Sequence, residues 1–385
     1  MISRFLSATA AAVGSTVRSS VATPIYYSTK LSGLTPGTTY HYRVRHGGGA
    51  TSDSTFSTAP DGDGPFRFTA FGDESVSSSA VTIMNGVLSQ NPVFHLHAGD
   101  LAYAGGTAST WDNYLAQIEP LSSRVPWMIS YGNHEQESGF DYHGYSGVQA
   151  RFPNTLTSNS NVYYAFRYRN VGVIALDSNE QSYEYTSNYN WTAGAQTTWL
   201  SAKLAEFRAV GSGIDFIVVH FHFCPYCTNT THPSDLRARN AWSGIFDTYG
   251  VDVVLNGHNH CYERTYPIKA NTVVDNTVGN NGVITDTNRG PVYVCTGGGG
   301  QSLYTGFYAA GASRARGSGG LVTDTIQNFH AYRNATYQYM VVDVTPATGT
   351  DPVATMQLRS INGSGTTLDT FTVQRTVATP PVTVP

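Results

Sequence analysis

Five short blocks of metal-binding residue types follow one another along the chain, each at the end of an apolar stretch. In order they are Gly72-Asp73, Gly99-Asp100-Leu101-Ala102-Tyr103, Gly132-Asn133-His134-Glu135, the run 217–222 that ends at His222, and Gly257-His258-Asn259-His260. Carboxylate oxygens can bridge two cations while imidazoles complete the coordination of each, so this mixture suits two neighbouring metal ions. One His-x-His pair could occur by chance, but five blocks in this order predict a dinuclear metal hydrolase.

Strands and helices are expected to alternate through the part of the chain that carries these blocks. Apolar runs predict strands at 66–71, 93–97, 125–130, 171–176, 216–221 and 251–255, and helical spacing predicts helices at 79–90, 111–118, 195–207 and 242–249. Later strands are expected at 291–296, 337–344 and 354–359. The alternation predicts an α/β layered fold, in which ligands bind beyond the carboxyl ends of the strands.

A different pattern precedes residue 66. Residues 25–58 alternate apolar and polar side chains around a turn at Pro36-Gly37, as half-buried strands do. The segment 31–40 resembles the later strands of a fibronectin type III-like sandwich, in which Tyr40 would be the corner tyrosine. We therefore expect a partial all-β sandwich domain over 1–58 that lacks its first strands, a linker over 59–65, a catalytic domain over 66–375 and a loose tail over 376–385.

The composition excludes some classes of partner. Charged residues make up only 12% of the 385 residues, whereas the chain has 39 Gly and 25 Tyr, which is typical of β-rich extracellular proteins. The net charge of −4 includes no basic block, so we do not expect a nucleic acid scaffold as partner. No apolar run approaches the roughly 18 residues that a bilayer span needs, so we expect no membrane insertion.

Secretion is the expected localisation, although residues 1–13 make a poor signal peptide. Four Asn-x-Ser/Thr sequons, at Asn190, Asn229, Asn334 and Asn362, fit a secreted glycoprotein. Such sequons also occur by chance in chains that are rich in Asn and Thr, so they support secretion without establishing it.

The chain has four cysteines, at Cys224, Cys227, Cys261 and Cys295. Cys224 and Cys227 have the spacing of a redox pair or of half a zinc site. Because a second Cys-x-x-Cys is missing and no βαβ redox pattern surrounds the first, the sequence favours one or two disulfides near the metal site. Their pairing stays open.

Taken together, the five blocks resemble those of the purple acid phosphatases, a group within the calcineurin-like metallophosphoesterases. The resemblance covers about residues 20–345 and implies a layered α-β-β-α sandwich. Tyr103, three residues after Asp100, is the distinguishing residue, because a tyrosine at that place ligates a ferric ion in this group. One departure is Ser75, which stands where the family usually has glycine.

The resemblance also implies how the metal ligands are divided. One ion would be held by Asp73, Asp100, Tyr103 and His260, and the other by Asp100, Asn133, His222 and His258. Asp100 would then bridge the two ions. A phenolate suits Fe(III), and the neutral Asn and His donors suit a divalent metal such as Zn, Fe or Mn.

Three further histidines need an interpretation. His220 and His222 face the same side of a strand, so the strand pattern alone leaves the ligand open. The resemblance favours His222, because family members have a tyrosine four residues after the ligand histidine and Tyr226 is in that place. It also places His134 and His232 near substrate, where His134 could protonate the leaving group; a solvated loop residue is the alternative for His232.

The expected function is hydrolysis of phosphate monoesters of small molecules at acidic pH, by metal-activated hydroxide at a dinuclear Fe(III)–M(II) centre. The same metal core could instead act on phosphodiesters or nucleotide pyrophosphate bonds, and the loops around 179–190 and 228–234 would decide. A non-catalytic extracellular adhesion protein is a third reading, against which the intact blocks argue. The sequence leaves the oligomeric state and the physiological substrate open.

Overall fold

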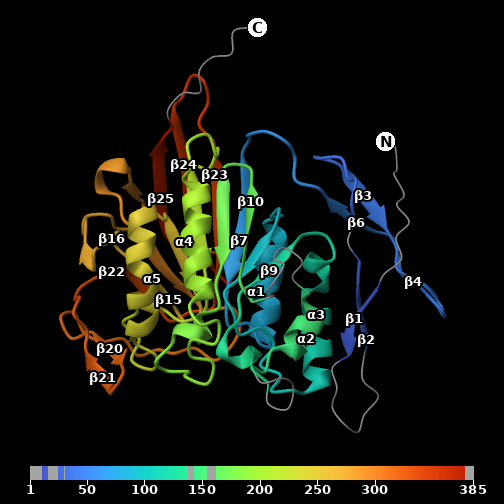
Figure 1. Ribbon diagram of the computed structural model, residues 1–385, viewed down its shortest axis with the longest axis horizontal. Coiled ribbons are helices and arrows are strands. Elements are labelled where there is room, and N and C mark those ends of the chain that lie inside the picture. The colour runs from blue at the N-terminus through green and yellow to red at the C-terminus, as the bar shows by residue number, and fades with distance from the viewer. Residues whose placement is uncertain (1–10, 16–24, 30, 138–142, 154–161, 378–385) are drawn as a thin grey trace.

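Two seven-stranded sheets lie at the centre of the computed structural model, which describes residues 11–15, 25–29, 31–137, 143–153 and 162–377 (Figure 1). The first sheet has the order β18 (Gly282–Ile284), β25 (Thr367–Thr376), β24 (Val353–Asn362), β23 (Gln338–Thr345), β7 (Phe66–Phe71), β8 (His95–His97) and β9 (Trp127–Ile129). The second has the order β10 (Tyr164–Tyr168), β11 (Val171–Ala175), β12 (Phe216–His220), β14 (Val253–Asn256), β19 (Val292–Thr296), β15 (Tyr262–Thr265) and β22 (His330–Asn334).

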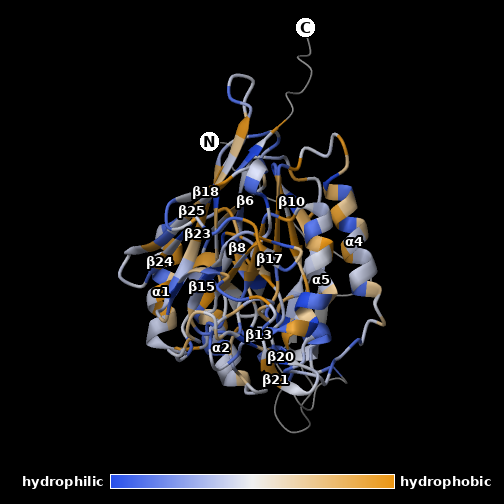
Figure 2. Ribbon diagram, turned by 90° about the vertical axis from the view of Figure 1, so that its left-hand side faces the viewer, coloured by the Kyte–Doolittle hydropathy of each residue, from blue (hydrophilic) through white to orange (hydrophobic). Residues whose placement is uncertain are grey.

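Helices cover the outer faces of the two sheets. On one side lie α1 (Ser78–Ser89), α2 (Ala108–Ser122) and the short α3 (Ser146–Arg151); on the other lie α4 (Ala195–Phe207) and α5 (Leu236–Tyr249). Figure 2 shows α1 and α2 on one side, α4 and α5 on the other, and the strands between them. The expected α-β-β-α sandwich is thus confirmed.

The two-residue period of the strands explains this layering. In β23, Met340 and Val342 point into the core between the sheets, whereas Val341 packs against the helices on the outer face. In β12, Val218 belongs to the same central core and Val219 packs with α4 and α5. Successive side chains of a strand point to opposite faces, so a strand buried on both faces must be apolar throughout.

The parallel strands set the place of the ligand blocks. β7, β8 and β9 are parallel, and so are β11, β12, β14 and β19. The carboxyl ends of parallel strands meet at one edge of a sheet. Each ligand block follows one of these strands, so residues far apart in sequence meet at this edge.

Most predicted elements are present, with some differences at their ends. The helix expected at 242–249 begins earlier, at Leu236, because the Asp235 carboxylate accepts hydrogen bonds from two backbone N–H groups of its first turn. The long strand β25 was not expected, although its alternating burial, with Phe371 and Val373 inside, follows the β period. It ends at Thr376, inside the predicted loose tail, and residues 378–385 of that tail lie outside the described residues.

Within its described residues, the segment before residue 66 forms three separate two-stranded pairs: β1 (Ala11–Ser15) with β2 (Ile25–Ser28), β3 (Thr39–Tyr42) with β6 (Ser54–Ser57), and β4 (Arg45–His46) with β5 (Gly49–Ala50). Tyr40 is buried, and its hydroxyl accepts a hydrogen bond of 2.8 Å from the Thr35 N–H. Tyr42 donates to the Ser123 carbonyl just after α2, at 2.7 Å. The proposed domain boundaries, which also include residues outside the described ranges, stay a prediction.

Smaller sheets complete the fold on the flank of the second sheet. β16 (Ile268–Lys269) pairs with β17 (Thr272–Val273). β20 (Arg314–Gly317) pairs with both β13 (Ser234–Asp235) and β21 (Gly320–Thr323) in a three-stranded sheet. Among the helices of the described ranges, none has the length and hydropathy that a bilayer crossing requires.

Candidate metal centre

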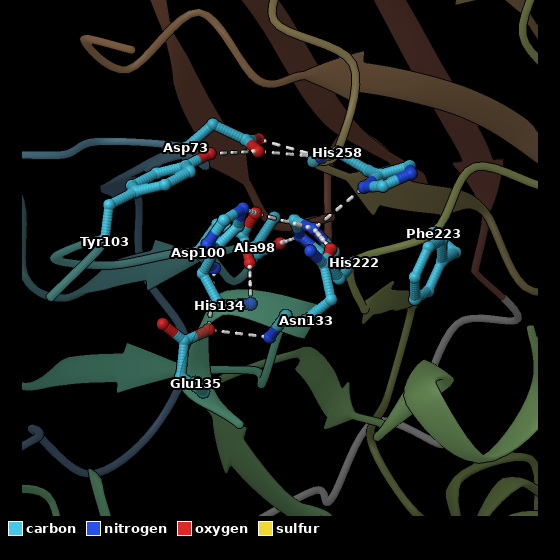
Figure 3. A network of polar contacts seen from close by, with 12 residues as sticks. Asp73, Ala98, Asp100, Tyr103, Asn133, His134, Glu135, His222, Phe223 and His258 are labelled. Atoms are coloured by element: carbon cyan, nitrogen blue, oxygen red, sulfur yellow. Dashed lines mark hydrogen bonds and ion pairs between the residues drawn. The ribbon is translucent and has the colours of Figure 1, made fainter. Parts of the chain in front are cut away.

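All seven predicted ligands meet at the carboxyl edge of the two sheets, and most of them are labelled in Figure 3. A first group consists of Asp73, Tyr103 and His260. The Tyr103 hydroxyl lies 3.1 Å from Asp73 Oδ1 and 3.0 Å from His260 Nε2, and His260 Nε2 lies 3.4 Å from Asp73 Oδ1. Three loops that follow β7, β8 and β14 therefore bring three donor atoms to one point.

The second group is centred on His222. Its Nε2 lies 3.2 Å from Asp100 Oδ2, 3.1 Å from Asn133 Oδ1 and 3.2 Å from His258 Nδ1. The two groups adjoin each other, because the Asp73 carboxylate accepts hydrogen bonds from the His258 backbone N–H (Figure 3).

The hydrogen bonds behind the imidazoles of His222 and His260 orient their Nε2 atoms toward the other candidate ligands. His222 Nδ1 is 2.9 Å from the Ala98 carbonyl and His260 Nδ1 is 2.7 Å from the Ser302 carbonyl. A carbonyl can only accept, so each Nδ1 carries a hydrogen, and each Nε2 is the atom that faces the carboxylate, amide or phenol oxygens and that a cation could bind in exchange for a proton.

Such an arrangement fits cations. Donor atoms that share one metal ion, with bonds of about 2.1 Å, lie roughly 3.0–3.4 Å apart, and the contacts in both groups fall in this range. The donor chemistry and the spacing therefore both fit two adjoining metal ions.

The pKa shifts of His222 and Tyr103 agree with the binding of cations at this site. Burial alone would lower the pKa of His222, but the neighbouring Asp100 carboxylate outweighs it and raises the pKa to about 10. Burial and the nearby carboxylates of Asp100 and Asp73 raise the pKa of Tyr103 well above its ordinary value. The site thus favours positive charge, and a Tyr103 phenolate would need a cation beside it.

The backbone is held in an unusual conformation at four of the ligand positions. Asp73, Asp100, Tyr103 and His258 have φ values of 60°, 56°, 52° and 67°. A non-glycine residue in this left-handed region costs roughly 1–2 kcal/mol, and such strain is concentrated at functional sites. Gly99, at φ 86°, precedes Asp100, and a Cβ there would lie 2.8 Å from His222 Nδ1.

Glu135 holds two of the ligand loops together, a role that the sequence reasoning missed. Its buried carboxylate accepts hydrogen bonds from the backbone N–H groups of Asp100 at 2.7 Å, Leu101 at 2.8 Å and Gly132 at 2.7 Å. The sequence feature that could have revealed this role is the position of Glu135 in the third block, directly after Asn133 and His134. Glu135 therefore fixes the loop of Asp100 against the loop of Asn133.

The structure places His222, and not His220, among the other candidate ligands. His220 is fully buried within β12, where its ring centroid lies 6.3 Å from that of Tyr164. Burial lowers its pKa to about 3. The metal-binding roles themselves stay predictions.

His134 and His232 lie on the open side of the ligand groups. The His134 side chain is 48% exposed, its Nε2 is 4.0 Å from Asp100 Oδ2, and its ring centroid lies 4.2 Å from that of Tyr103, with the two rings tilted. The His232 ring is 4.1 Å from that of His258. Both could reach a substrate that is bound over the ligands.

Three residues beside the centre, Glu184, Tyr304 and Arg316, were not singled out from the sequence, although Glu184 lies in one of the loops expected to line it. Glu184 contacts His258 Nε2 at 3.1 Å and His232 Nδ1 at 2.5 Å, and Arg316 Nη2 lies 3.5 Å from its carboxylate. The ring of Tyr304 stacks on that of His260 at 4.1 Å. Only the packing of these loops brings them to the centre.

One expectation about this region, the disulfides, is wrong, and one of the four sequons is not accessible. The four cysteines are free and buried, instead of joined in disulfides, because several sulfurs surround each thiol rather than a single partner. The sequon residue Asn229 is fully buried, and its side-chain amide donates to the Tyr304 carbonyl at 3.1 Å. A glycan cannot be attached there in this fold.

Sequence comparisons identify relatives of the chain. The calcineurin-like phosphoesterase model matches residues 67–262. An uncharacterized protein of Mycobacterium tuberculosis is 33% identical over 307 residues, which cover 71% of this chain and 58% of that protein. Purple acid phosphatase 22 of Arabidopsis thaliana is 32% identical over 241 residues, covering 61% of this chain and 52% of the relative. The chain thus spans little more than half the length of these relatives.

Solved structures share the fold. The purple acid phosphatase PPD1 from yellow lupin seeds has a TM-score of 0.70 at 20% identity, over 92% of this chain and 64% of that one. PhoD has a TM-score of 0.55 at 13% identity, over 94% and 83%. The ligand blocks, the layered fold and the family model agree, and the chain therefore belongs to the calcineurin-like phosphoesterases, with purple acid phosphatases among its homologues.

Proposed function

We propose that this protein is a metal-dependent phosphatase that hydrolyses phosphate monoesters of small molecules at acidic pH. The observation that carries the proposal is the pair of adjoining donor groups, one with a tyrosine and a carboxylate, the other with an amide and two imidazoles. The names of the relatives support it: besides the purple acid phosphatases, a phosphoenolpyruvate phosphatase of Allium cepa is 29% identical over 70% of this chain.

The division of the ligands follows the two groups. Fe(III) would be held by Asp73, Tyr103 and His260, and a divalent Zn, Fe or Mn by Asn133, His222 and His258, with Asp100 shared. Asp100 suits the shared position, because its charge acts on Tyr103 in the first group while it contacts His222 in the second. When bound, such a pair of cations activates water and neutralises charge on the phosphoryl oxygens.

The chain's own side chains supply the remaining functions. His134, exposed above Asp100, is placed to give a proton to the leaving oxygen. Glu184 accepts hydrogen bonds from His232 and His258, so it holds the two rings next to each other. Arg316, beside Glu184, brings a positive charge to the side where a phosphate ester would arrive.

Elemental analysis and substrate comparison test the proposal. The purified full chain should contain iron and a divalent metal and show the visible absorption of tyrosinate bound to Fe(III), which Tyr103→Phe should remove. It should cleave p-nitrophenyl phosphate faster than bis-p-nitrophenyl phosphate. The reverse preference would favour the phosphodiesterase alternative, and a colourless protein without iron would contradict the purple acid phosphatase type.

We also infer that the protein is secreted. The low charge and the sequon at Asn190, which is exposed, support this inference. Expression in a eukaryotic host should yield protein in the medium whose mass falls on removal of N-glycans, and retention inside the cell would contradict it.

A further inference from the structure

Behind the candidate metal centre, the four cysteines form one buried cluster. Cys224 and Cys227 lie in the loop after β12, Cys261 directly precedes β15, and Cys295 lies within β19. The antiparallel pairing of β15 with β19, in which Glu263 is opposite Cys295, brings the last two together. Three separate parts of the chain therefore supply the four sulfurs.

The sulfurs surround a common centre instead of pairing. The Sγ atoms of Cys224, Cys227 and Cys295 lie within 4.8 Å of one another. Cys227 and Cys295 each interact with all three other thiols, including that of Cys261. Disulfides would leave each sulfur with one close partner. A tetrahedral ion with Zn–S bonds of about 2.3 Å holds four sulfurs roughly 3.8 Å apart, so that each has three neighbours.

Hydrogen-bond donors point at three of these sulfurs, and acceptors also contact the cluster: Cys295 Sγ lies 3.2 Å from the Asn259 carbonyl and Cys227 Sγ lies 3.3 Å from Glu263 Oε2. The Asn229 backbone N–H is directed at Cys227 Sγ at 3.5 Å, and the Asn229 side-chain amide at Cys261 Sγ at 3.8 Å. The Gly297 backbone N–H donates to Cys295. Donors to sulfur stabilise thiolates, and partners of this kind orient metal ligands. The burial of Asn229, which serves no glycan, is explained by this role.

The cluster also supports the loops of the phosphoesterase centre. Cys261 directly follows His260 in the chain, and Cys224 comes two residues after His222. Cys224 Sγ contacts the Gly257 carbonyl at 3.1 Å, next to His258. An ion that joins the four sulfurs would therefore hold in place the loops of three candidate imidazole ligands.

We propose that Cys224, Cys227, Cys261 and Cys295 bind one structural Zn²⁺ ion, separate from the two metals of the phosphoesterase centre. Sulfur-only tetrahedral donor sets select zinc or iron, and a closed, four-ligand site is typical of structural zinc. The missing second Cys-x-x-Cys is no obstacle, because the sheet pairing supplies the other two cysteines. This inference does not depend on the proposed phosphatase activity.

The first experiment uses the unmodified full chain, purified without chelator. Zinc should be present at one ion per chain beyond the metals of the phosphoesterase centre, and Asp100→Asn should lose the latter but keep the zinc. After denaturation with a chelator and without reductant, all four cysteines should react with iodoacetamide. Cysteines that react only after reduction would show disulfides and overturn the proposal, as would four reactive thiols in a chain without the extra zinc.

A second experiment identifies the ligands. Exchange of the zinc for Co²⁺ in Asp100→Asn should produce the intense thiolate-to-Co²⁺ charge-transfer band and the visible bands of tetrahedral sulfur coordination. Cys227→Ser should weaken the charge-transfer band and lower the zinc content. Ser234→Ala, which removes a neighbouring hydroxyl that contacts the Cys227 backbone, is the matched control and should keep both. Cobalt bands without charge transfer, or iron in place of zinc, would contradict the zinc–thiolate assignment.

Discussion

The candidate metal centre and the cysteine cluster are built from neighbouring stretches of the same loops, yet they differ in three ways. The centre presents oxygen and nitrogen donors, opens to solvent at His134, and holds its ligands on left-handed backbone. The cluster presents sulfur, is buried, and takes Cys295 from a regular strand. Catalytic metal sites keep an open position whereas structural sites are closed. The comparison therefore supports the proposals of a catalytic role for the first region and a structural role for the second.

Replacing His222 should have the largest effect of all. His222→Ala removes a donor whose Nε2 meets three other candidate ligands, so we expect loss of the divalent metal and of nearly all turnover. His220→Ala, two residues away within β12, should lower stability and keep both metals. Elemental analysis and initial rates measure the two outcomes. If His220→Ala removes the metal and His222→Ala does not, the division of the ligands is wrong.

His134 tests the open side of the centre. Loss of a general acid slows reactions by about 10²–10⁴-fold, and most for poor leaving groups. His134→Ala should therefore slow alkyl phosphates far more than p-nitrophenyl phosphate while both metals are retained, with a smaller effect of the same kind for His232→Ala. Equal losses on both substrates would indicate that His134 positions the phosphate instead.

The pH dependence of the free energy of unfolding tests whether the buried His220 ring is neutral. Burial lowers the pKa of His220 to about 3, below the value near 6.5 expected in the unfolded chain. Folding therefore favours the neutral ring: its stabilising contribution is complete above about pH 6.5 and is lost as the pH falls toward 3. Thermal unfolding between about pH 7 and pH 4 should show this loss, and His220→Met should reduce it. An unchanged pH slope in His220→Met would count against a neutral buried ring.

Replacing Ser75 should have the smallest effect, and it tests the strain of the left-handed backbone at this position. It has φ 66°, and its N–H donates to the Leu101 carbonyl at 2.7 Å. Glycine is relaxed in this conformation but gains freedom in the unfolded chain, so Ser75→Gly should stabilise the fold by roughly 0.5–1 kcal/mol. Ser79→Gly, the same change within α1, should destabilise it instead. Chemical denaturation measures both variants, and destabilisation by Ser75→Gly would mean that the side chain itself is needed.

Several features of the fold and of the candidate metal centre could be predicted from short segments of the sequence. The ligand types at Asp73, Asp100 and His258, and their places after apolar strands, could be recognised because donor chemistry and strand period are properties of short segments. The helix α4 occupies the predicted residues 195–207 for the same reason. The layered fold followed from the alternation of these elements.

Only the tertiary structure decided which residues meet. His220 and His222 share a strand face in the sequence, but β12 ends at His220, so only His222 reaches the ligand loops. Glu184 comes to the centre from another loop, and Cys295 reaches Cys261 through the pairing of β15 with β19. These contacts depend on how the strands and loops pack in space, and a contact between residues distant in sequence leaves no periodic signal in either segment.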